Sequence, residues 1–173
     1  MSTYPVPYAG QRIDATLLAS MMPTITWKAS NTDRAATTTF EDDPDLIVSL
    51  EAGAVYHVCF YLHHAAVNTA RFKTIWRVPN GATGTRSVIG PDQGAVLSST
   101  SSGGQGRYGV HNFDTACTYG CRDNNTLLCA GIEEAVVVTA DAGTLAVQWA
   151  QATSSATFSR LGAGSSLHVR RLA

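Results

Sequence analysis

The sequence predicts an all-β domain, an antiparallel β-sandwich or jelly roll preceded by a short helix and an extended arm. Apolar residues alternate with polar ones in segment after segment, turns rich in Gly, Pro and Asn separate these segments at short spacing, and only one stretch near the N-terminus shows helical spacing. The 173 residues are the size of one ordinary domain and are enough to bury a core. No internal repeat is visible.

The N-terminal stretch "YPVPYAGQRIDATLLASMMP" differs from the rest of the chain. It opens with two prolines and two tyrosines, which favour an extended conformation outside any sheet interior. Asp14 is expected to cap a short helix, and Pro23 is expected to end it. A helix of about nine residues is not stable alone in water, so it must dock on its own sheet or on a neighbour. The apolar docking stripe is predicted to comprise Ile13, Leu17, Leu18, Met21 and Met22.

We therefore predict two parts, an anchor arm with a short helix over residues 1–30 and a β-sandwich domain over residues 31–173. A strand is expected from Ile25, and the threonine-rich segment 34–40 is expected to be extended. Further strands are expected on both sides of the turn 51–53, in "FKTIWRVP", and at 125–130, 134–140, 144–150 and 166–172. The region from about 84 to 112 is rich in Gly and Ser. Within it, "SSTSSGGQGRYG" is expected to be an exposed excursion.

Composition argues against several kinds of partner. The formal net charge is −1 and only 14% of residues are charged, so the clustered basic excess that nucleic acid or an anionic membrane requires is missing. A weakly charged surface rich in hydroxyl and amide groups suits a protein that works inside a packed assembly. The N-terminus lacks the pattern of a signal peptide, and the apolar runs are only strand-sized. We expect the chain to be made and folded in a cytoplasm, with neither a nucleic acid nor a membrane as a partner.

The four cysteines are expected to be free thiols. Cys59 lies in a strand pattern and is interpreted as a small buried apolar residue. Cys117, Cys121 and Cys129 could form a disulfide or part of a zinc site, but their spacing is not that of zinc knuckles and no histidine follows at finger spacing. We predict no metal and no cofactor.

The strand "YHVCFYLHH" carries the most chemically versatile side chains. His57, Cys59, Tyr61 and His63 share one face of it, and Tyr56, Val58, Phe60, Leu62 and His64 share the other. Alternating His and Cys could bind zinc or pair as nucleophile and base. Residues i and i+2 on a strand are roughly 6.5 Å apart and splay outward, so a site would need ligands from another strand. We therefore interpret this segment as a buried strand whose histidines are hydrogen-bonded.

No catalytic constellation emerges elsewhere. The acidic segment Glu41, Asp42, Asp43 and Asp45 could bind calcium, but it lacks the pattern of an EF-hand, and Pro44 favours a solvated turn. Glu133 and Glu134 could be paired carboxylates, yet adjacent strand residues point to opposite faces. There is no GxSxG elbow and no Walker loop. The sequence predicts a protein that is not an enzyme.

The tryptophans are expected to pack rather than to bind ligands. Trp76 and Trp149 each alternate with apolar neighbours, which favours burial in the domain or at a subunit interface. Gln148 lies on the face opposite Trp149 and is a candidate subunit contact, since an amide both donates and accepts hydrogen bonds. Gln151 shares the face of Trp149 only if the strand continues past Ala150.

Several segments together resemble a family of small virion proteins of tailed phages that infect actinobacteria, usually described as minor tail, tail-fibre-like or hypothetical proteins. The segments are "AGQRIDATLLASMMP", "NTDRAATTTFEDDPDLIVSLEAGAVYHVCFYL", "FKTIWRVPNGATG" and "GTLAVQWAQATSSATFSRLGAGSSLHVRRLA". They cover most of the chain except the Gly/Ser-rich middle. The resemblance implies a trimeric β-sandwich module that an N-terminal segment anchors to the virion, and it carries no active-site residues.

Three hypotheses follow. The first is a non-enzymatic virion protein, a minor tail or fibre component or a capsid decoration, that forms a homotrimer and binds other virion proteins. The second is a module for host cell-wall glycans, with contacts from the loops 98–108 and 152–158. The third is an enzyme such as a wall hydrolase that uses His57, His63 or the carboxylates.

Overall fold

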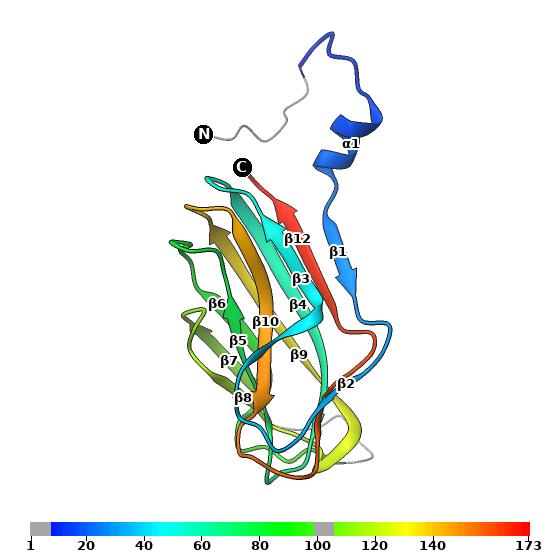
Figure 1. Ribbon diagram of the computed structural model, residues 1–173, viewed down its shortest axis with the longest axis vertical. Coiled ribbons are helices and arrows are strands. Elements are labelled where there is room, and N and C mark those ends of the chain that lie inside the picture. Colours follow the sequence, from blue (N-terminus) through cyan, green and yellow to red (C-terminus); the bar gives the residue numbers. More distant parts are fainter. Residues whose placement is uncertain (1–7, 99–105) are drawn as a thin grey trace.

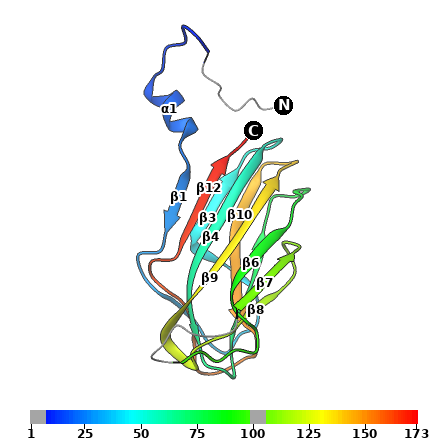
Figure 2. The ribbon, with the colours of Figure 1, turned by 180° about the vertical axis from the view of Figure 1, so that it is seen from behind.

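Two antiparallel sheets pack face to face and form an all-β sandwich, which confirms the expected fold class. The computed structural model describes residues 8–98 and 106–173. Figures 1 and 2 show the two sheets and a single short helix beyond one end of the sandwich, near the C-terminus. Within the described residues, no helix is long and apolar enough to cross a membrane.

Over residues 8–98 and 106–173, one helix is followed by twelve strands. The bounds are α1 (Ala15–Met21), β1 (Thr24–Trp27), β2 (Thr32–Arg34), β3 (Glu41–Leu50), β4 (Val55–Ala66), β5 (Phe72–Arg77), β6 (Arg86–Pro91), β7 (Gly106–His111), β8 (Cys117–Tyr119), β9 (Asn124–Val138), β10 (Gly143–Gln151), β11 (Ser159–Leu161) and β12 (Ser166–Arg171).

The two sheets differ in size. In the large sheet the strand order is β1-β12-β4-β9-β6-β7, and the short strands β2 and β11 join it beside β4. The small sheet has the order β3-β10-β5-β8. Gly53 adopts φ +63° in the turn between β3 and β4, which places this turn where the sequence predicts it.

The core lies between the sheets and is made by the inward-facing rows of both. From β4 these are Tyr56, Val58, Phe60, Leu62 and His64, all buried as the alternation predicts. Trp149 on β10 is fully buried and Trp76 on β5 is 3% exposed, which confirms that both tryptophans pack in the core. The ring of Trp76 packs edge-to-face against Phe60, with a centroid distance of 4.8 Å.

The region between 84 and 138 contains more strand than the sequence predicts. The expected strands 125–130 and 134–140 are parts of the single strand β9, because residues 131–133 continue the pairing opposite β4. Strands β6 and β7 pair with each other within the Gly/Ser-rich region. The inward positions of β6 include Arg86 and Gly90, and those of β7 include Arg107 and Gly109, so neither strand shows an apolar alternation. Residues 99–105 of the expected excursion lie outside the described residues.

The prediction of a solvated acidic turn is wrong, because residues 41–50 form strand β3 and Asp43 is fully buried. The buried ammonium of Lys28 compensates this carboxylate: its Nζ lies 2.9 Å from Asp43 Oδ1 and 2.7 Å from Asp45 Oδ2. The indole Nε1 of Trp149 also donates to Asp43 Oδ2, at 3.2 Å. Pro44 is tolerated because β3 is an edge strand.

Candidate functional site

Helix α1 and its flanking residues carry the predicted docking stripe: Leu17, Leu18 and Met21 lie in the helix, Ile13 precedes it and Met22 follows it. Asp14 caps the helix, as the sequence predicts, by accepting a hydrogen bond at 2.8 Å from the backbone N–H of Leu17. Ile13 and Met22 are each 64% exposed and Leu18 is 55% exposed, whereas Leu17 and Met21 are partly buried. Figure 1 shows α1 beyond the end of the sheets. Much of the apolar stripe therefore faces outward, available to a partner.

Gln148 and Gln151 have different surroundings. Gln148 lies on the outer face of the small sheet and is half-buried, and its amide donates to Asp42 Oδ1 at 2.8 Å. Gln151 is fully buried, because β10 continues through it and turns it to the face of Trp149. Its amide donates to the carbonyl of Thr157 at 2.7 Å and accepts from the N–H of Ser155 at 3.0 Å. Gln151 thus shapes the loop 152–158, while a role for Gln148 between subunits stays a prediction.

The two faces of β4 separate its histidines as the sequence predicts, but they do not form a common site. On the outer face, His57 pairs with Glu134 of β9, and the ring of His63 lies 3.5 Å from the carbonyl of Ala163. On the inner face, His64 is fully buried and stacks on Phe72, with 4.9 Å between ring centroids.

The expectation that buried histidines are hydrogen-bonded is wrong for His64. Neither of its ring nitrogens has a hydrogen-bond partner among the described residues. Burial, with a smaller contribution from His63, lowers the pKa of His64 to about 3. The ring is therefore a neutral part of the aromatic core at physiological pH.

Glu133 and Glu134 point to opposite faces of β9, as expected, so they cannot act on one bond as a glycosidase pair. The buried Glu133 carboxylate accepts hydrogen bonds from Trp76 Nε1 at 2.5 Å and from the Tyr119 hydroxyl at 2.6 Å, and it also pairs with the buried guanidinium of Arg86. Burial first, and then the charge of Glu133, raises the pKa of Tyr119 well above its ordinary value. Because these residues come from both sheets, the cluster joins the two layers.

The cysteines are free thiols, as expected. All four are buried, and none forms a disulfide. Burial raises the pKa of Cys129 to about 11, which keeps this thiol protonated and poorly nucleophilic at neutral pH. In the part of the chain that the structure describes, no three His, Cys, Asp or Glu side chains gather as a metal-binding group.

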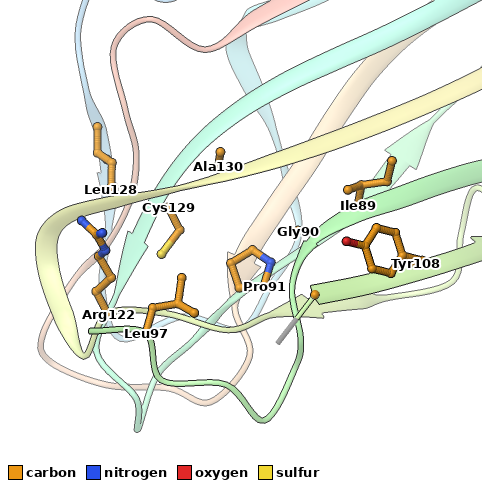
Figure 3. Close-up of a pocket in the computed structure, with 10 residues that line it drawn as sticks. Ile89, Gly90, Pro91, Leu97, Tyr108, Arg122, Leu128, Cys129 and Ala130 are labelled. Atoms are coloured by element: carbon orange, nitrogen blue, oxygen red, sulfur yellow. The ribbon is translucent and has the colours of Figure 1, made fainter. Parts of the chain in front are cut away.

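A pocket of about 410 Å³ opens where β6, β7 and β9 approach the loop around Leu97. Figure 3 shows Ile89 and Tyr108 at one end of it, and Arg122 with Leu128 at the other. Tyr108 is 81% exposed, and its ring lies over Gly106, where an added Cβ atom would come within 2.9 Å of the hydroxyl oxygen. The lining combines one aromatic surface and one guanidinium with an otherwise apolar wall.

No local pattern in the sequence identifies this pocket. The segment 98–108 is expected to be a loop that could carry contacts, whereas residues 106–108 belong to β7, and the pairing of β7 with β6 brings Ile89 opposite Tyr108. Arg122 and Cys129 come from a later part of the chain, and no local pattern links them to residue 108. The exposed Tyr108 in a Gly-rich segment is the one signal that the sequence offers.

Comparison with known proteins yields distant structural likenesses. No protein-family model matches the chain, and no curated protein sequence matches it. The structure is similar to the tripod of the baseplate of bacteriophage Tuc2009, with 9% identity and a TM-score of 0.34 over 99% of this chain and 75% of that one. It is also similar to the VP2 subviral particle of infectious bursal disease virus, with 10% identity and a TM-score of 0.23 over 87% of this chain and 38% of that one. At such values these likenesses carry no argument about function.

Proposed function

We propose that this chain is a non-enzymatic structural protein of a phage virion that assembles with itself, as a trimer, and attaches to the particle through its N-terminal anchor arm. The observation that carries the proposal is the outward apolar stripe of α1. Leu18 lies within α1, and Ile13 and Met22 stand close to its two ends. All three are exposed by 55% or more, and such exposure of large apolar side chains at so short a helix is unfavourable without a partner.

The sequence supports the same proposal. Its segments resemble those of small virion proteins of phages that infect actinobacteria, and only 14% of its residues are charged. The partner that α1 fits is another virion protein with an apolar groove, since helices of this kind bind through residues spaced three to four apart. The protein could attach in this way at the tail tip, in a fibre or on the capsid surface.

The experiment is reattachment to particles that lack the protein. We expect the purified wild-type chain to bind such particles, and the double variant Leu18→Asp/Met22→Asp to bind at least about tenfold more weakly, because charges in an apolar contact must be desolvated. The control is Val96→Asp, which alters an apolar side chain of similar exposure, 50%, in the loop that follows β6. Equal binding by all three proteins would contradict attachment through α1.

A second candidate function is recognition of a host cell-wall glycan, and the pocket beside Tyr108 is the observation that favours it. An exposed aromatic ring can stack on a sugar, and a guanidinium can donate hydrogen bonds to its hydroxyl groups. Tyr108 and Arg122 lie in one pocket of about 410 Å³, which is large enough for a small ligand.

Binding to purified cell-wall glycans tests this second function. Wild type is expected to bind, and Tyr108→Ala is expected to lose most of the binding. Tyr8→Ala removes a tyrosine of comparable exposure, 72%, away from the pocket and should bind like wild type. If wild type binds no glycan fraction, the pocket has another role.

A further inference from the structure

The outward face of the large sheet carries a row that is apolar or aromatic at every strand except β12, where Ser166 stands. In an antiparallel sheet, residues directly opposite each other share a face. The pairings Trp27–Ser166, Ser166–Tyr61, Tyr61–Ile132, Ile132–Ile89 and Ile89–Tyr108 therefore place one residue from each of six neighbouring strands in a single line across the sheet. We call this line the aromatic row. Trp27 is 63% exposed and Tyr108 is 81% exposed, one at each end of it.

Further apolar side chains flank the aromatic row. Ile25 and Val110 lie on the same face one row further along, at opposite edges of the sheet, and Val136 and Val138 extend the face along β9. All four are exposed by 43% or more. Charge is sparse on this face of the six strands: Glu134 pairs with His57, and Arg170 is exposed on β12. His63 and His168 also lie on this face. The outer face of the large sheet is thus largely apolar and carries one carboxylate, one guanidinium and three imidazole rings.

The outer face of the small sheet differs because it carries polar and charged side chains, as expected of a sheet that faces water. Arg77 forms an ion pair with Asp42 at 2.7 Å, and Gln148 donates to the same carboxylate at 2.8 Å. Lys73, Thr144 and Ser49 share this face. Because an antiparallel sheet that faces water is normally polar on that side, the small sheet follows the rule and the large sheet departs from it.

The apolar face has the dimensions of an interface between proteins. The six strands hold 49 residues between them, and each residue covers about 16 Å² of the face at a rise of about 3.4 Å and a strand spacing of about 4.8 Å. The product, roughly 800 Å², equals the area of about 800 Å² that each partner buries in a stable complex of standard size.

We propose that a second copy of this chain covers the outer face of the large sheet. The area of the face is that of a contact with another protein. Its charges favour a second copy, because Glu134 of one copy can face Arg170 of the other when two identical faces stack, and the apolar residues of the two faces then meet. A self-complementary contact of this kind is what closed symmetric assemblies use. Two identical faces that stack are related by a two-fold axis, so the contact makes a dimer. The inference rests on the self-assembly in the proposed function, replaces its trimer with this dimer, and assigns the contact to the aromatic row rather than to Gln148.

The test compares two isoleucines of similar exposure on the two outer faces. Ile89 is 43% exposed on the large sheet, and Ile47 is 36% exposed on the small sheet. Sedimentation velocity over a dilution series should show wild type and Ile47→Asp as oligomers. Ile89→Asp should raise the dissociation constant by about thirtyfold or more, as expected for a charge placed in the centre of an apolar contact.

A second variant separates assembly from folding and from the pocket. Val110→Asp changes a side chain that is 66% exposed at the edge of the same face and does not line the pocket beside Tyr108. It is expected to dissociate the oligomer while keeping the circular dichroism spectrum and the thermal midpoint of wild type.

Each contrary outcome has its own meaning. If wild type is an oligomer and both Ile89→Asp and Val110→Asp remain oligomers of the same size, the face is not the contact and the inference is overturned, whereas self-assembly in the proposed function stands. If wild type is monomeric at every concentration, a second copy does not cover the face. In that case the reattachment experiment tests the attachment to the particle on its own. If the monomer binds particles through α1, the attachment in the proposed function stands. If Ile89→Asp loses this binding, the face contacts another virion protein.

Discussion

Glu133 is the side chain on which the contact between the two sheets depends most. Its carboxylate is fully buried and faces Arg86 from its own sheet and Trp76 and Tyr119 from the other. Removing its charge leaves a buried guanidinium without a counter-ion, which is far more costly than loss of an exposed pair. The adjacent Glu134 is half-exposed and provides a natural comparison.

We therefore expect Glu133→Gln to lower the free energy of unfolding by about 3–5 kcal/mol. Glu134→Gln should change it by about 0–1 kcal/mol, because a solvent-screened pair contributes little. Urea denaturation of the two variants and wild type measures both values. Similar midpoints for the two variants would contradict the role assigned to the buried cluster.

His64 should make stability depend on pH. Its pKa is about 3 in the folded protein and lies near 6.5 in the unfolded chain, so the unfolded chain binds one more proton between these values. The stabilisation is complete above pH 6.5 and is lost as the pH falls towards 3, by about 1.4 kcal/mol per pH unit.

His64→Phe, which keeps an aromatic ring beside Phe72, removes this titration. The difference in unfolding free energy between wild type and variant should shift by about 2–3 kcal/mol in favour of the variant between about pH 7 and pH 4.5. Carboxylates titrate in both proteins, and their contribution cancels in the difference. Parallel stability curves over this range would show that His64 is not held neutral.

Strands β6 and β9 meet β8 through glycines that the ring of Tyr119 covers. A Cβ atom added at Gly90 would lie 2.7 and 2.8 Å from ring atoms of Tyr119, and one added at Gly131 would lie 3.0 Å from the same ring. These contacts explain why β6 carries a glycine within a strand and why β9 passes without interruption through a position that resembles a turn in the sequence.

Gly90→Ala is expected to destabilise the protein by about 1–3 kcal/mol, since a buried ring and strand backbone must move apart. Gly94→Ala is the matched control, because its added methyl group would meet nothing closer than 3.8 Å, and its effect should stay within about 0.5 kcal/mol. Thermal unfolding distinguishes the two. An unchanged midpoint for Gly90→Ala would mean that the strands adjust without cost.

The molecule presents two unlike outer faces, one polar and one apolar, together with an apolar helix at one end. This division fits a subunit that contacts a copy of itself over the large sheet and the particle through α1. A contact made by the aromatic row depends little on charge. Its dissociation constant should therefore stay within about threefold between about 0.1 M and 1 M sodium chloride, although such salt shortens the screening length from about 10 Å to 3 Å.

Sedimentation velocity at the two salt concentrations makes this measurement on the full chain. Dissociation in high salt would indicate that ion pairs hold the assembly, as an interface centred on Arg77 and Asp42 of the small sheet would. The expected result is one sedimenting species at both concentrations.

Local patterns were sufficient for the sandwich, the capped helix and the burial of Trp76 and Trp149. Each of these depends on alternation, capping or turn residues within a few positions, which a sequence displays directly. The same reasoning missed β6 and β7, because inward positions hold Arg86 and Gly90 in β6, and Arg107 and Gly109 in β7, instead of regular apolar residues. The sequence indicated the apolar docking stripe at α1. It did not indicate which residues of that stripe are exposed.

The sequence by itself determined the all-β class of this protein, the capped helix ahead of its strands and the weakly charged composition that suits assembly. Only the tertiary structure decided that Lys28 neutralises Asp43, that Arg86 neutralises Glu133, and that Trp27 and Tyr108 end one row across six strands. The physical reason is the separation of the partners along the chain. Register between distant strands sets which side chains meet, and that register depends on the packing of the whole sandwich.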